Sequence, residues 1–182
     1  MSVVCAFLLR LLGWKSSLSV PIPQKCVICV APHTSNWDFI IGMLFYKSIK
    51  GSPYFLMKES WFFFPLNYIL KSLGGIPVNR SQQTSLTEQL AERFRQRDTF
   101  QLAITPEGTR KKNPKWKTGF YYIAYEVGVP ISIAYLNYSE KIIGVFENLI
   151  PTGDVEKDIA YIKTLYRNIP AKHPKQFAFR HG

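Results

Sequence analysis

The pair of residues best suited to chemistry is His33 and Asp38, a histidine and a carboxylate five residues apart. The apolar run 26–31 before them is typical of a buried strand, and the apolar run 39–46 after them is typical of a helix. Because each residue of an α-helix turns by about 100°, residues five apart in one helix lie on different faces. The two side chains can therefore meet only if His33 precedes the helix and the chain folds back.

A chain that folds back in this way needs a residue that caps the start of the helix, and Thr34 or Ser35 can be this N-cap. A carboxylate facing His33 would hold the imidazole in one tautomer and stabilise its protonated form, which suits a general base for a hydroxyl group. The same residues also fit a capped helix start with a hydrogen-bonded histidine. The pair alone leaves both interpretations open.

A second candidate is the loop Thr105–Arg110, in which a glycine turn presents backbone donors, the Thr109 hydroxyl and the Arg110 guanidinium. This combination suits a phosphate, and Glu107 could brace Arg110. A tight turn with a surface ion pair would look the same. The loop is followed by a basic run that could recruit an acidic carrier or the phosphates of a large cofactor: Lys111, Lys112, Lys115 and Lys117.

Strand and helix patterns alternate along the chain, which predicts an α/β fold with a mixed, largely parallel sheet flanked by helices. The expected strands are 25–31, 54–57, 76–78, 100–104, 129–134 and 142–146. The expected helices after the first are 39–50, 61–73, 81–97, 119–128 and 154–168. Ligands of such sheets bind beyond the carboxyl ends of the strands. His33, Lys58, Arg80 and the loop 105–110 all follow expected strands, so they are expected to form one site.

The 182 residues suggest one domain at 25–169, preceded by an apolar helix and linker (1–24) and followed by a poorly ordered basic tail (170–182). The apolar segment 1–14 is too short to cross a bilayer. It can lie in a membrane interface or pack on the domain. The aromatic run 61–66 is likewise either core or a lipid-facing surface.

The chain carries 23 Lys and Arg against 12 Asp and Glu, a formal net charge of +11 that favours an anionic partner. The aromatic residues lie in apolar runs rather than between basic residues, which speaks against nucleic acid. Cys26 and Cys29 are three apart in a strand and should point to opposite faces, which argues against a redox or zinc pair. We expect no metal and no bound cofactor.

Four short motifs in order resemble the glycerolipid (lysophospholipid) acyltransferases, the family that includes the 1-acyl-sn-glycerol-3-phosphate acyltransferases. A histidine, four residues and an aspartate match at His33–Asp38. A glycine, an apolar stretch and an arginine match at Gly75–Arg80. Pro-Glu-Gly-Thr-Arg matches fully at Pro106–Arg110, and an apolar-proline step into a strand matches at Val129–Ile131. Four motifs in order over about residues 25–135 are far more specific than any one.

The resemblance implies an O-acyltransferase acting on glycerolipid-type acceptors. His33 would be the general base and Asp38 would orient it. The acyl donor would be acyl-CoA or acyl carrier protein as co-substrate, and the default acceptor would be lysophosphatidic acid. The acceptor's anionic head would be bound by Lys58, Arg80, Glu107, Gly108, Thr109 and Arg110. The oxyanion and acyl-donor region would comprise Gly75, Ile76, Pro77, Val78 and Lys117.

Other acceptors stay open, because Asn79 stands where many members of that family carry an acid. They include an amino-acid-containing lipid or another hydroxylated lipid. The charge and the resemblance together predict a peripheral protein on the cytoplasmic face of a membrane, in the bacterial inner membrane. Two alternatives remain: a non-catalytic binder of anionic lipid, and a hydrolase that uses the same pair with water as acceptor.

Overall fold

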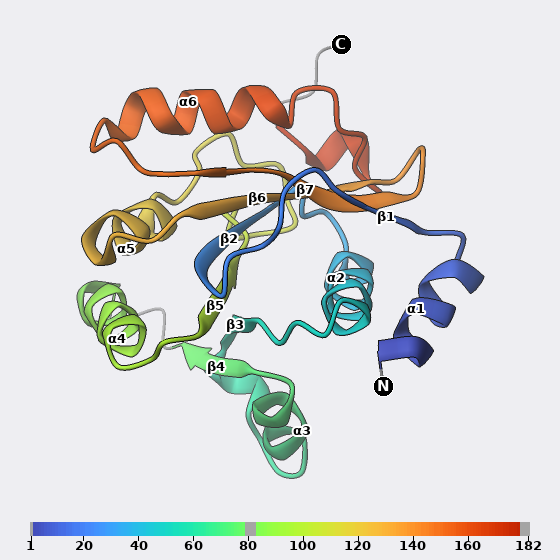
Figure 1. The fold of residues 1–182 in the computed structure, drawn as a ribbon, viewed down its shortest axis with the longest axis horizontal. Helices are drawn as coiled ribbons and strands as arrows, with labels where there is room; N and C mark the ends of the chain where they lie inside the picture. The colour runs from blue at the N-terminus through green and yellow to red at the C-terminus, as the bar shows by residue number, and fades with distance from the viewer. Residues whose placement is uncertain (1, 79–82, 179–182) are drawn as a thin grey trace.

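The computed structural model describes residues 2–78 and 83–178, which form one seven-stranded sheet flanked by helices (Figure 1). The strands are β1 (Lys15–Leu18), β2 (Lys25–Ala31), β3 (Tyr54–Lys58), β4 (Gly75–Val78), β5 (Phe100–Ile104), β6 (Ile131–Asn137) and β7 (Ile142–Leu149). The helices are α1 (Ser2–Leu11), α2 (Asn36–Ser48), α3 (Leu66–Ser72), α4 (Gln83–Arg95), α5 (Gly119–Val127) and α6 (Val155–Leu165). Two short 3-10 helices are η1 (Glu59–Trp61) and η2 (Pro174–Gln176).

The strand order is β1-β7-β6-β2-β5-β3-β4, and every neighbouring pair is parallel except β6 with β7. The expected mixed, largely parallel α/β sheet is therefore confirmed. Because β2, β5, β3 and β4 run in one direction, their carboxyl ends meet at one edge. The short strand β4 lies at the border of the sheet, as Pro77 with its missing N–H donor predicts.

The core has two parts, one on each face of the sheet, and the alternating side chains of β2 divide between them. Val27, Cys29 and Ala31 pack with α4, α5 and α6 on one face. Cys26 and Ile28 pack with α1 and α2 on the other. The two cysteines thus point to opposite faces, as their spacing predicts.

Two differences from the sequence-based expectation lie at the ends of the chain. The expected linker 16–24 is wrong in its first part, because residues 15–18 form strand β1 and pair with β7. The expected disorder of the tail is wrong for residues 170–178. There Ala171 and Phe177 are buried in the core, with η2 between them. Neither segment shows an apolar period, so local pattern could not reveal its packing.

Two apolar surfaces remain exposed. The outer face of α1 exposes Val3, Val4, Phe7 and Leu11, while Leu9 is buried against the domain. The aromatic segment, residues 61–69, exposes Trp61, Phe63, Phe64, Tyr68 and Ile69. Most of this segment is therefore on the surface, although Phe62 and Leu66 are half-buried. Within the described residues no helix is long and apolar enough to cross a membrane.

Candidate active site

The first turn of α2 is built by a capping box. Ser35 is the N-cap, and its Oγ accepts the N–H of Trp37 at 3.2 Å. Asp38, the third residue of the helix, reaches back with its Oδ2 to accept the N–H of Ser35 at 2.8 Å and that of Thr34 at 2.7 Å. Of the two N-caps that the sequence allowed, the structure thus selects Ser35.

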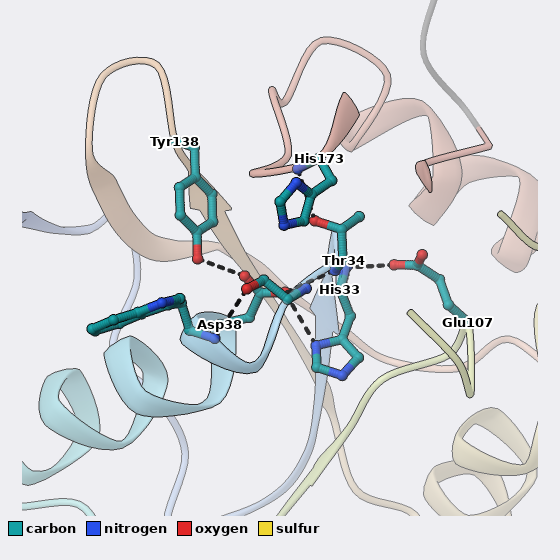
Figure 2. Close-up of polar contacts among 8 residues, drawn as sticks. His33, Thr34, Asp38, Glu107, Tyr138 and His173 are labelled. Carbon is teal, nitrogen blue, oxygen red and sulfur yellow. Dashed lines mark hydrogen bonds and ion pairs between the residues drawn. The ribbon is translucent and has the colours of Figure 1, made fainter. Parts of the chain in front are cut away.

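His33 stands outside the helix, and the chain folds back so that His33 and Asp38 meet. The distance from His33 Nδ1 to Asp38 Oδ2 is 3.3 Å. Figure 2 shows the other ring nitrogen of His33 on the side away from Asp38. The expected juxtaposition of the two side chains is confirmed, and the Asp38 contact is made by Nδ1 rather than Nε2.

The Asp38 carboxylate is buried, with 3% of the residue exposed. Its second oxygen, Oδ1, accepts the hydroxyl of Tyr138 at 2.6 Å. Burial on its own would raise the pKa of Asp38, but hydrogen bonds from His33, Tyr138 and the Ser35 amide outweigh it and hold the pKa below the usual value. Asp38 is therefore ionised at neutral pH and can stabilise a protonated His33.

Glu107 is buried at 1% exposure and lies on the other side of His33. Its Oε1 accepts the backbone N–H of His33 at 2.6 Å (Figure 2). The sequence suggested that Glu107 braces Arg110, whereas in the structure it holds the backbone that carries the proposed base. Burial raises the pKa of Glu107 to about 8, with a further increase from the charge of Asp38, against the lowering effect of the His33 amide.

The loop after β5 is held in a fixed shape beside this pair. Gly108 has φ of 65°, in the left-handed region that glycine adopts without strain. A Cβ at Gly108 would lie 2.9 Å from Cε of Lys117, so the Lys117 stem covers the turn. The backbone N–H of Lys117 donates to the Pro106 carbonyl at 2.8 Å. The Asn113 side-chain amide donates to the Glu107 carbonyl at 2.9 Å.

The other predicted head-group residues lie at the same edge with different surroundings. Thr109 Oγ1 accepts the N–H of Lys111 at 3.2 Å, and Arg110 is exposed. Lys58 is exposed at the carboxyl end of β3. Arg80 falls outside the described residues. The structure thus brings together His33, Asp38 and Glu107 directly, and Lys117 against Gly108.

The predicted oxyanion region is spread along β4. Val78 lies at the carboxyl end of the strand, whereas Gly75 lies at its amino end, about 10 Å away at the usual rise per residue. A Cβ at Gly75 would lie 2.8 Å from the Leu70 carbonyl oxygen, so this glycine permits the close approach of α3. Ile76 is buried in the core, and Pro77 has no N–H to donate.

Two contacts to this site come from parts of the chain that its sequence motifs do not include. Tyr138 follows β6 and reaches Asp38 across 100 residues. The backbone N–H of His173, in the tail, donates to Thr34 Oγ1 at 3.2 Å. Neither residue has a spacing or composition signal that connects it with the His33 motif, so sequence reasoning could not find them.

The two thiols of β2 are unsuited to nucleophilic attack. Burial raises the pKa of Cys26 to about 11 and that of Cys29 to about 12, so both stay protonated at neutral pH. Among the described residues, no cluster of three or more His, Cys, Asp and Glu side chains is arranged to hold a metal ion.

Comparisons with known proteins converge on one family. A probable 1-acyl-sn-glycerol-3-phosphate acyltransferase of Mycoplasma pneumoniae is 30% identical over 122 residues, which cover 60% of this chain. The match spans 44% of that relative's length. The crystal structure of the 1-acyl-sn-glycerophosphate acyltransferase PlsC of Thermotoga maritima superposes with a TM-score of 0.66 at 16% identity. The superposition covers 90% of this chain and 74% of that one, and at this identity it shows the shared fold.

The family model described as Acyltransferase matches residues 17–135. This range includes His33, Asp38, the strand β4 and the loop 105–110, so it contains the whole candidate site except Tyr138 and the tail. Since the match covers well over half of the sequence, this chain belongs to the acyltransferase family.

Proposed function

We propose that this chain transfers a fatty acyl group from acyl-CoA or acyl carrier protein to a hydroxyl of a lyso-lipid, with lysophosphatidic acid as the default acceptor. The observation that carries the proposal is the 3.3 Å contact between His33 Nδ1 and Asp38 Oδ2, which leaves Nε2 turned away from Asp38. The name of the Mycoplasma relative supports the choice of acceptor. The acceptor can instead be an amino-acid-containing or other hydroxylated lipid.

The reaction needs one base and no covalent intermediate on the protein. His33 Nε2 takes the proton of the acceptor hydroxyl, and the oxygen attacks the thioester carbonyl carbon. The tetrahedral intermediate collapses with cleavage of the carbon–sulfur bond, and the thiolate takes the proton from His33. The products are the acylated lipid and the free thiol, so protons and electrons balance. Asp38 stabilises the imidazolium that forms between the two proton transfers.

The remaining roles follow the same edge of the sheet. Gly108, Thr109, Arg110, Lys58 and Arg80 would bind the acceptor's anionic head. Glu107 would act through the His33 amide, because its carboxylate is buried there. Donors for the oxyanion would come from the Gly75–Val78 strand, where the Val78 end lies closest to the carboxyl edge. Lys117 would lie on the side of the site where the acyl donor binds.

The substrates are lipids, and we propose that the chain works on the cytoplasmic face of a bacterial inner membrane as a peripheral protein. The exposed apolar face of α1, the exposed aromatic segment and the net charge of +11 support binding at a membrane surface. A bilayer rich in anionic lipid would hold both substrates near the edge of the sheet.

The test is acyl transfer from labelled acyl-CoA and, in parallel, labelled acyl carrier protein to a panel of lyso-lipids. His33→Ala should reduce transfer by about a thousandfold or more, since it removes the base. His173→Ala is the matched control, because the His173 contact with Thr34 is made by the backbone. It should keep wild-type activity.

Wild-type activity in His33→Ala would remove the proposed base. Release of free fatty acid without an acceptor would instead indicate a hydrolase. Salt-sensitive lipid binding without transfer to any acceptor would support a non-catalytic binder of anionic lipid.

A further inference from the structure

The Asp38 carboxylate receives donors of two kinds. Its Oδ2 is occupied within its own segment, by the Thr34 and Ser35 amides and by the facing His33 ring. Its Oδ1 accepts the Tyr138 hydroxyl at 2.6 Å, and this donor comes from the turn between β6 and β7. Among the contacts that the described residues show, Tyr138 is therefore the one that reaches the carboxylate from outside the segment 33–38.

The hydrogen bond from Tyr138 fixes the rotation of the Asp38 carboxylate about its Cβ–Cγ bond. Both backbone donors converge on Oδ2, so they constrain one oxygen and leave the rotation of the carboxylate about its own axis less determined. A donor on Oδ1 fixes this rotation and keeps Oδ2 aimed at His33 Nδ1. Without Tyr138, Oδ1 would be a buried acceptor with no partner, which favours its turning toward another donor.

Tyr138 is itself held in place by two residues that do not belong to the α2 turn, Trp14 and Pro170. Its ring packs edge-on against Trp14, with 5.0 Å between centroids and 89° between planes. Its backbone N–H donates to the Pro170 carbonyl at 3.0 Å. The hydroxyl therefore reaches Asp38 from a residue whose ring and backbone are both held by other parts of the chain, which is what a positioning group needs.

From these contacts we infer that Tyr138 is a positioning residue for the His33–Asp38 pair, holding the Asp38 carboxylate ionised and correctly rotated. The catalytic part of this inference rests on the proposed function, and the electrostatic part does not. Three ionisable side chains act on Asp38 here: His33 from the loop before α2, Tyr138 from the β6–β7 turn and Glu107 from the loop after β5. The tail adds His173 beside Thr34.

The decisive experiment removes only the hydroxyl, in Tyr138→Phe. Tyr135→Phe is the matched control, since it removes a hydroxyl from the same stretch of chain. The ring of Tyr135 stacks on Phe146. The pKa of Asp38 is read from the carboxyl carbon shift in a 13C-aspartate NMR titration. It should rise by about one unit in Tyr138→Phe, because a hydrogen bond to the charged form is lost, and stay unchanged in Tyr135→Phe.

Activity gives a second readout. In Tyr138→Phe, kcat should fall by about tenfold to a hundredfold while KM for the acceptor stays within about twofold, since the head-group residues are untouched. A merely structural role would lower the thermal midpoint and leave the pKa of Asp38 unchanged.

A stronger donor should act in the opposite direction. Site-specific 3-fluorotyrosine at position 138 keeps the ring and makes the hydroxyl a stronger hydrogen-bond donor. The pKa of Asp38 should therefore fall. An unchanged Asp38 pKa in both variants would overturn the inference, whatever the enzyme assay shows. An Asp38 pKa that moves as stated, in a protein that transfers no acyl group, would support the positioning role and count against the proposed function alone.

Discussion

At the scale of single residues, the site is decided by two buried carboxylates with opposite environments. Asp38 accepts donors at both oxygens and stays charged. Glu107 accepts one backbone N–H at Oε1, while its Oε2 has no hydrogen-bond partner in the described structure. The two carboxylates lie on either side of His33. Their environments drive their pKa values apart, which is the arrangement expected where acid–base chemistry is performed.

Glu107→Gln tests the environment of this residue. The pKa of Glu107 is about 8 in the folded chain against its usual value of 4.5, so folding takes up a proton between these values. The stability that Glu107 contributes is complete below pH 4.5 and is lost as the pH rises toward 8. The loss over this interval should be about 3–5 kcal/mol in wild type and absent in the neutral variant.

Urea unfolding at pH 5 and pH 8 measures this difference. Between pH 5 and pH 8, the unfolding free energy of wild type should fall relative to that of Glu107→Gln. Glu156→Gln, at an exposed position of α6, is the control and should follow wild type. Parallel curves for wild type and Glu107→Gln would show that Glu107 is ionised in the folded state throughout.

At the scale of elements, the border strand β1 shows how a polar segment becomes part of the sheet. Its sequence, Lys-Ser-Ser-Leu, has no alternating apolar pattern, and it pairs in parallel with β7. The approach is unusually close at Gly144, where a Cβ would lie 1.9 Å from the Ser17 carbonyl oxygen. Because Gly144 of β7 has no side chain, β1 can pair alongside it.

Gly144→Ala should break this pairing, because the clash is with backbone rather than with the end of a flexible side chain. We expect a loss of about 2–3 kcal/mol in unfolding free energy and faster amide exchange in residues 15–18. The control is Gly42→Ala in α2, where a Cβ would meet nothing within 4 Å. It should gain about 0.5–1 kcal/mol through helix propensity. Equal stabilities for both variants would contradict the close approach.

At the scale of the whole molecule, the two exposed apolar surfaces, on α1 and on the aromatic segment, are each accompanied by cations. Figure 1 shows α1 and α3 both below the sheet in this view, on the side away from α6. Exposed cations accompany the two apolar surfaces: Arg10 and Lys15 at the end of α1, and Lys58 and Lys71 around the aromatic segment. Glu59 is the exposed acid in that second group. Apolar rings flanked by cations fit an anionic bilayer surface.

Phe64→Ala tests this surface, since Phe64 is 80% exposed and so contributes little to the folded core. Binding to phosphatidylglycerol vesicles in a flotation assay should weaken by about fivefold or more, because one buried ring is lost from the interface. Tyr122→Ala, which removes a half-exposed ring from α5, is the control and should bind as wild type does.

Binding of the wild type should also fall with added salt and in phosphatidylcholine vesicles, because the cations then lose their partners. Equal binding by Phe64→Ala and wild type would exclude the aromatic segment as a contact. Sedimentation of the wild type as a dimer that Phe64→Ala dissociates would assign the surface to a second copy of the chain.

The sequence by itself determined the features that depend on neighbours along the chain. The alternation of strand and helix patterns along the chain was sufficient to predict the α/β sheet, because the spacing of apolar residues reflects local backbone geometry. The meeting of His33 and Asp38 was also predictable, since five residues and an N-cap leave few ways for the chain to run. Pro77 likewise predicted that β4 is short or near an edge, and β4 is both.

Only the tertiary structure decided the contacts that cross the chain. The Tyr138 hydroxyl reaches Asp38 over 100 residues, and Glu107 reaches the His33 amide over 74. No periodicity links such partners, because sheet order and loop packing bring them together. The exposure of the aromatic segment was undetermined for the same reason: its composition fits a core and a lipid surface equally, and only the surrounding elements show that nothing in the described chain covers it.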